Sequence, residues 1–131
     1  MEMDKKPVGE PIAYNLSLLE EVCDEGSIQE ILSAFLMTLP EQLTALQQAN
    51  AEKDFDQLVF ISHKLKSSTG MMQATVLTEN LHKIEQLSRE KAEAAHLIQR
   101  TVSLFEELTR QLEKGEGVRP GQMKNSNIWK Y

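Results

Sequence analysis

The chain has 131 residues, a formal net charge of −6 and a single cysteine, Cys23. This length fits one domain and is too short for a nucleotide-binding domain beside a second functional one, and a lone cysteine excludes an intramolecular disulfide framework and favours a reducing, cytoplasmic setting. The acidic charge argues against nucleic acid and anionic membranes as partners, because clustered Lys and Arg bind both, and without a long apolar run we expect no membrane span or secretion signal.

The first part of the chain predicts a lead-in and two helices. Residues 1–14 combine two prolines and a glycine with mixed charges, which predicts a flexible lead-in. A short helix is expected over residues 17–22. Ser27 and Glu30 form an S-x-x-E capping box that predicts the start of a long helix, and Pro40 predicts a kink or a break within it. The apolar face of this helix consists of Ile28, Ile31, Leu32, Phe35, Leu36, Leu39, Leu43 and Leu46.

Three more helices complete the expected domain. Asp54, with Gln57 three residues on, predicts the start of a helix that extends to Met72. The apolar positions of the next two helices are Leu77, Leu81, Ile84 and Leu87, then Ile98, Val102, Phe105, Leu108 and Leu112. No segment alternates like a strand. We therefore expect an all-α fold, an up-and-down antiparallel four-helix bundle with a short extra N-terminal helix, over residues 15–114, and a mobile tail over residues 115–131.

The third long pattern presents one histidine away from the core. At about 100° per residue, Leu58, Ile61, Leu65 and Met72 fall on one side of the helix and His63 falls on the opposite side. Helical spacing places small, apolar and basic residues on the exposed side, where they become neighbours. We expect a partner-docking surface formed by Val59, Phe60, Lys64, Ser67, Gly70 and Met71.

This arrangement suits phosphoryl chemistry. Imidazole changes charge near neutral pH, and its neutral form is a nucleophile. Attack by His63 on a phosphoryl group would form a phosphohistidine, and the ammonium of Lys66, three residues along, would interact with the phosphoryl oxygens. The small residues Ser67 and Gly70 would leave room for another protein to approach. His63 and Lys66 are therefore the candidate reactive residues.

The local string carries a family resemblance. Residues 63–70, H-K-L-K-S-S-T-G, followed by Ala74 and Leu77, resemble the H-x-L-K-G-[SA]-x-x-x-[LM]-G-A-x-x-L motif of histidine-containing phosphotransfer (HPt) domains. The flanking helix patterns resemble that family from about Asn15 to Glu113. By this resemblance, residue by residue, His63 is the phospho-accepting histidine, Lys66 the nearby lysine, Leu65 the inward-facing leucine and Met72 the apolar residue before the turn.

Two positions depart from the family pattern. Ser67 stands where glycine is commonest, a small-for-small exchange that preserves access for a partner. Gln73 stands where the family has the glycine before Ala74. Two interpretations of Gln73 are open: the turn after the helix differs, or its side chain reaches the phosphoryl group.

The resemblance implies a phosphorelay carrier. HPt domains accept a phosphoryl group from the aspartate of a receiver domain, often in a hybrid sensor kinase, and pass it to the aspartate of another receiver, often in a response regulator. The receiver supplies Mg²⁺ and an acidic pocket, so we expect no metal or cofactor of this chain's own. The sequence has no P-loop or other glycine-rich phosphate cradle, and we expect a monomeric phosphocarrier without ATP-dependent kinase activity.

The sequence allows two other interpretations. A sensor-kinase dimerisation helix displays its histidine in an H-E-x-x-x-P string, whereas here Lys64 follows the histidine and no room remains for a catalytic domain. A non-catalytic helical adaptor stays open, and loss of His63 or Lys66 would favour it. His82 and His96 are expected to be ordinary helix residues. No recognised zinc spacing connects Cys23, His63, His82 and His96.

Overall fold

The computed structural model describes residues 12–114, and within this range the chain forms five helices and no strand. The helices are α1 (Ser17–Val22), α2 (Glu25–Glu52), α3 (Phe55–Met71), α4 (Thr75–Arg89) and α5 (Ala95–Lys114). The all-α prediction is therefore confirmed. None of these described helices is long and apolar enough to cross a membrane. Most of the predicted lead-in and all of the predicted tail over residues 115–131 lie outside the described residues.

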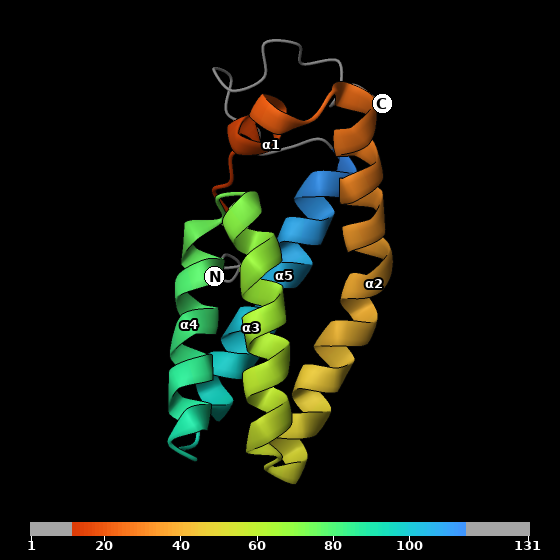
Figure 1. Cartoon of the computed structure of the whole chain (residues 1–131). Coiled ribbons are helices and arrows are strands. Elements are labelled where there is room, and N and C mark those ends of the chain that lie inside the picture. Colours follow the sequence, from red (N-terminus) through yellow and green to blue (C-terminus); the bar gives the residue numbers. More distant parts are fainter. Residues whose placement is uncertain (1–11, 115–131) are drawn as a thin grey trace, which may run out of the picture.

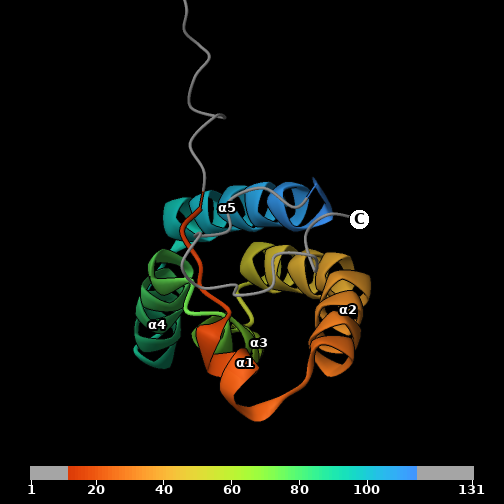
Figure 2. The ribbon, with the colours of Figure 1, turned by 90° about the horizontal axis from the view of Figure 1, so that it is seen from above.

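The four long helices lie side by side around one core (Figures 1 and 2). Each contacts two neighbours, in the order α2, α3, α4, α5 and back to α2, and α3 and α4 make the most extensive contact. The sequence colours in Figure 1 run down α2, up α3, down α4 and up α5, so neighbouring helices run antiparallel. The short α1 lies at the end of the molecule where α2 begins and α3 ends.

The core consists of the apolar stripes that the sequence predicts, with small corrections at their edges. The buried side chains include Leu58, Ile61, Leu65 and Met72 from the third pattern and all five predicted positions of α5. Three predicted positions lie at the edge of their stripe: Ile31 is exposed, and Leu36 and Leu87 are half-buried. A helix buries a stripe of limited width, so apolar residues on its flank remain in contact with solvent.

The predicted capping box at the start of α2 is wrong. The helix begins one turn earlier, because Asp24 is the N-cap and its Oδ1 accepts a hydrogen bond from the backbone N–H of Ser27 at 2.8 Å. This hydrogen bond lowers the pKa of Asp24 below its ordinary value. A carboxylate is a strong cap, since it accepts an otherwise unpaired amide and carries the charge favoured at a helix N-terminus. Ser27 therefore lies in the first turn, and its amide is the donor that is capped.

Pro40 bends α2 without ending it. The helix is continuous from Glu25 to Glu52, so the alternative of a break is wrong. Figure 2 shows the axis changing direction between the orange first half and the yellow second half. Proline removes one backbone donor and crowds the preceding turn, and a bend relieves this crowding while the apolar stripe keeps both halves on the core.

The end of the predicted lead-in packs against the bundle. Ile12 and Tyr14 are buried, and the buried side chain of Gln111 bonds both backbone groups of Ile12. The amide of Ile12 donates to Gln111 Oε1 at 2.5 Å, and Gln111 Nε2 donates to the carbonyl of Ile12 at 3.0 Å. Residues 12–14, which the sequence places in a flexible lead-in, therefore belong to the folded domain.

Gln73 forms the turn between α3 and α4 in a left-handed conformation, with φ of 52°. Its backbone N–H donates to the carbonyl of Gly70, and its side-chain Oε1 accepts from Ser17 Oγ at 3.3 Å. The preceding carbonyl, of Met72, accepts from the amide of Asn15 at 2.8 Å. The structure therefore joins the side chain of Gln73 to α1, and the backbone explains why a glycine would suit this position, because only glycine adopts positive φ without a steric penalty.

Replacing Gln73 with glycine is expected to stabilise the domain. The left-handed conformation costs an L-residue about 1–2 kcal/mol, of which the greater backbone entropy of glycine offsets part, so we expect a net gain of about 0.5–1 kcal/mol for Gln73→Gly. Urea denaturation measures the change. Gln73→Ala, which loses the amide but keeps the strained backbone, is the matched control and should not stabilise. An equal gain in both variants would contradict this explanation.

Candidate functional site

His63 lies in the middle of α3 with its imidazole directed away from the core. The side chain is 64% exposed. Its neighbours along the helix, Ile61 and Leu65, are buried. The helix is anchored by Asp54, whose side chain accepts from the amide of Gln57 at 3.2 Å, as the sequence predicts. The exposure predicted for His63 therefore follows from a helix whose opposite face is fixed in the core.

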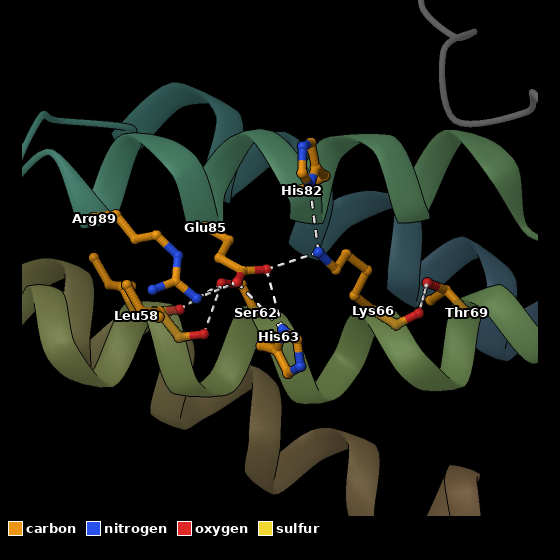
Figure 3. A network of polar contacts seen from close by, with 9 residues as sticks. Leu58, Ser62, His63, Lys66, Thr69, His82, Glu85 and Arg89 are labelled. Carbon is orange, nitrogen blue, oxygen red and sulfur yellow. Dashed lines mark hydrogen bonds and ion pairs between the residues drawn. The ribbon is translucent and has the colours of Figure 1, made fainter.

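Small polar side chains between α3 and α4 let the two helices approach each other. Ser62 is fully buried, and its hydroxyl donates to the carbonyl of Leu58 in its own helix at 2.6 Å. Further along, Thr69 Oγ1 and Thr78 Oγ1 lie 2.7 Å apart across the interface. Interhelical distance depends on the side chains at the contact, and short side chains allow a close approach. The approach brings Glu85 of α4 to the side of His63 (Figure 3).

Glu85 is a buried carboxylate with three charged or polar partners. Its side chain is only 4% exposed. Oε1 lies 2.8 Å from Lys66 Nζ, and Oε2 lies 2.7 Å from Arg89 Nη2 and 3.2 Å from His63 Nδ1. Figure 3 shows these side chains converging on the carboxylate from both helices. A buried charge is tolerated only when such partners compensate for the lost water.

The partners of Glu85 keep it ionised. Burial by itself opposes ionisation, but hydrogen bonds from Lys66 and Arg89, the positive charge of Lys66 and the hydrogen bond to His63 outweigh it and lower the pKa of Glu85 to about 2. An ionised carboxylate has no proton to donate, so it only accepts hydrogen bonds. The contact with His63 therefore requires a proton on the Nδ1 atom of the imidazole.

This contact determines which nitrogen of His63 is reactive. In neutral imidazole one nitrogen carries the proton and the other carries the lone pair. Because Nδ1 of His63 donates to Glu85, the lone pair lies on Nε2, on the other side of an exposed ring. The structure thus presents a nucleophilic nitrogen to solvent while a carboxylate holds the opposite edge of the ring.

Lys66 is held between two acceptors rather than extended into solvent. Its side chain is 23% exposed, and its ammonium contacts both Glu85 Oε1, at 2.8 Å, and His82 Nδ1, at 3.3 Å. An ammonium has three N–H donors, so these two contacts leave one donor for a further acceptor. Sequence analysis placed Lys66 next to His63 but gave no indication of these two contacts.

Five of the six predicted docking residues on α3 are exposed, and the sixth is half-buried. Phe60 is 60% exposed and Met71 44% exposed. Lys64, Ser67 and Gly70 are exposed as well, and Val59 is half-buried. The ammonium of Lys64 lies 5.9 Å from the centre of the Phe60 ring, a cation–π contact at the surface. A Cβ atom added to Gly70 would meet nothing within 4 Å, so the fold itself has room for a larger residue there.

The structure also places the other two histidines and the cysteine. No group of three or more His, Cys, Asp or Glu side chains among residues 12–114 is arranged to hold a metal ion. His96 is exposed near the start of α5, and Cys23 is a half-buried free cysteine packed against the core. His82 is exposed on α4, and its ring contacts the ammonium of Lys66, a contact that the sequence did not predict.

Sequence analysis missed Glu85 and Arg89. Glu85 follows Leu81 by four residues and lies beside Ile84, so a carboxylate occupies the edge of an apolar stripe, which is the signal that was available. Arg89, four residues further on, is placed to pair with it along the helix. Which neighbouring helix that edge faces is decided by packing and is not contained in the periodicity.

Comparison with protein families matches residues 30–116, more than half of the chain, to the family model described as Hpt domain. Comparison with curated proteins and with solved structures finds no match.

The lowered pKa of Glu85 predicts how stability depends on pH. The folded-state value of about 2 lies below the ordinary value of 4.5, so the carboxylate stabilises the fold above pH 4.5 and this contribution is lost as the pH falls toward 2. Urea denaturation between these pH values should show a shallower loss of stability in Glu85→Gln than in the wild type. Glu106→Gln, which removes an exposed carboxylate, should retain the wild-type slope; an unchanged slope in Glu85→Gln would contradict the prediction.

Proposed function

Because this chain belongs to the Hpt domain family, whose members carry phosphoryl groups on histidine in two-component phosphorelays, we propose that it is a phosphotransfer intermediate. In this proposal His63 accepts a phosphoryl group from the aspartate of a receiver domain and passes it to the aspartate of another receiver or response regulator. The chain acts as a phosphocarrier without kinase activity of its own, as a cytoplasmic monomer.

The observation that carries the proposal is the contact between His63 and Glu85. An exposed imidazole alone is common on helices, and nothing then determines which of its nitrogens carries the lone pair. Here the carboxylate accepts from Nδ1 at 3.2 Å, and the lone pair is left on the exposed Nε2. A second side chain that orients the nucleophilic group is typical of residues that form covalent intermediates.

The transfer step needs no proton movement. The Nε2 lone pair attacks phosphorus, a new N–P bond forms, and the P–O bond to the receiver aspartate breaks, so that the aspartate leaves as a carboxylate with the bonding electrons. Nδ1 keeps its proton, and the phosphorylated ring becomes a cation. Glu85 faces that cation at hydrogen-bonding distance and stabilises the charge as it develops. Reversal of the same steps delivers the phosphoryl group to the next aspartate.

Lys66 and the partner supply the remaining charges in this proposal. The third N–H of the Lys66 ammonium donates to a phosphoryl oxygen while the other two stay on Glu85 and His82. The receiver supplies the aspartate, its acidic pocket and Mg²⁺, and this chain contributes no metal. Lys64, Lys66 and Arg89 make the surroundings of His63 basic in a chain whose net charge is −6, which complements an acidic pocket.

The proposed docking surface consists of Val59, Phe60, Lys64, Ser67, Gly70 and Met71. We propose that α2, α3, α4 and α5 form an up-and-down four-helix bundle that serves as a rigid support for this surface. Exposed apolar side chains beside a reactive group suit a transient partner. The open space around Gly70 supports this assignment, because a glycine that the fold does not require in the last turn of a helix calls for another explanation.

His63→Gln is expected to abolish phosphoryl acceptance while the fold is retained, because the side chain is exposed. The experiment incubates the chain with a phosphorylated receiver domain and Mg²⁺ and follows an acid-labile, base-stable label on the protein. His96→Gln, an exchange at another exposed helical histidine, is the matched control and should be labelled like the wild type. Circular dichroism checks that each variant is folded.

Two outcomes would contradict the proposal. Retained labelling of His63→Gln would place the reaction on another residue. Failure of the folded wild type to accept a phosphoryl group from several receivers would favour a non-catalytic helical adaptor.

A larger side chain at Gly70 is expected to impair docking without damaging the fold. Gly70→Ala should raise helix stability by about 1 kcal/mol, and Gly70→Gln should also fold, because nothing lies within 4 Å of the added Cβ. Gln fills the approach to His63, so the KM for the phosphorylated receiver should rise in Gly70→Gln. Labelling by phosphoramidate, a small phosphoryl donor, should stay unchanged and separates docking from chemistry. An unchanged KM would exclude Gly70 from the docking surface.

A further inference from the structure

A second histidine takes part in the polar network, although it does not touch the phosphoryl group in the transfer step described above. His82 lies on α4, is exposed, and directs Nδ1 toward the ammonium of Lys66 at 3.3 Å. Figure 3 shows Lys66 of α3 reaching across to α4, with Glu85 on one side of its ammonium and His82 on the other. Lys66 is thus fixed by two acceptors that come from the same neighbouring helix.

The contact defines the protonation of His82. An ammonium only donates hydrogen bonds, so Nδ1 of His82 must carry the lone pair, and the ring proton lies on Nε2. His63 has the opposite arrangement, since its Nδ1 donates to the carboxylate of Glu85. One anion and one cation, themselves paired at 2.8 Å, therefore hold the two histidines in opposite tautomers.

We propose that His82 is a positioning residue for phosphoryl transfer, which holds the ammonium of Lys66 in place through the lone pair of its neutral imidazole. The inference rests on the proposed function of His63. With His82 and Glu85 as acceptors, two of the three N–H groups of Lys66 are fixed, and the direction of the third is fixed with them. A group that must meet a phosphoryl oxygen gains from such fixed geometry.

Protonation of His82 would break this arrangement. It would place an N–H on Nδ1 against the ammonium, and two like charges in contact repel. The charged groups around the contact are Lys66 from α3 and, from α4, Glu85 with its partner Arg89; Glu79 and Lys83 flank His82 along α4. Glu85 is already occupied by three donors, so it does not offer a protonated His82 a free acceptor of equal quality. Lys66 would keep its contact with Glu85 but lose the one with His82, so the direction of its third N–H would no longer be fixed.

Two exchanges at His82 test the role. Asn places an amide oxygen close to the position of Nδ1 and does not titrate, whereas Ala removes the acceptor. We expect His82→Ala to transfer about tenfold more slowly than the wild type at neutral pH, as for loss of one hydrogen bond to a charged group, and His82→Asn to recover most of the rate. When the pH is lowered so that imidazole becomes charged, the rate of His82→Asn should fall less than that of the wild type.

Nitrogen NMR gives a readout that does not depend on transfer. In the wild-type chain we expect His63 with its proton on Nδ1 and His82 with its proton on Nε2, and His82→Ala should change the Lys66 side-chain signals, whereas the exposed-site control His96→Ala should not. If His63 and His82 carry their ring proton on the same nitrogen, both on Nδ1 or both on Nε2, the inference is overturned. Equal rates and equal pH profiles in wild type and His82→Ala would overturn the role of His82 alone, while absence of any label on the wild type would overturn the proposed function and this role together.

Discussion

The burial of one carboxylate organises the candidate site of this protein. Glu85 is almost completely removed from water, and an isolated charge in that position would be strongly unfavourable. Lys66 and Arg89 compensate for the lost hydration, and His63 adds a third donor. Because Arg89 lies on the helix of Glu85 while the other two donors lie on α3, the same contacts that make the charge tolerable also fix the register between the two helices. Removal of any donor leaves the charge undercompensated, so the network acts as a unit.

The chemistry of the site follows from this compensation. A protonated carboxyl group could donate to Nδ1 of His63 and would allow either tautomer, whereas the ionised group selects one. The cations that keep Glu85 ionised, Lys66 and Arg89, thereby determine which nitrogen of His63 is nucleophilic. The structural ion pairs and the candidate reactive histidine therefore form one arrangement, which the low pKa of Glu85 holds together.

Periodicity predicted much of the fold and only part of the site. Helix positions and the exposure of His63 depend on local spacing, which the sequence contains, and Asp54 was recognised as a cap for the same reason. The errors concern choices between nearby options: Asp24 caps α2 in place of Ser27, and the bend at Pro40 does not become a break. Glu85 could not be assigned to His63, because the two residues are far apart in the sequence and meet only through the packing of α4 on α3. The place of Gln73 in the turn could be explained only from the backbone conformation, since a positive φ leaves no trace in side-chain spacing.

The same network suggests why the proposed phosphohistidine would be an intermediate rather than an end point. A lone carboxylate beside the phosphorylated, cationic ring would stabilise it strongly and slow the onward step. Glu85 instead shares its charge with Lys66 and Arg89, which moderates its attraction for the ring while retaining the hydrogen bond that orients it. Stabilisation that is shared in this way favours transfer in both directions. A carrier between two aspartates needs such a balance, because it must accept and release the same group with comparable ease.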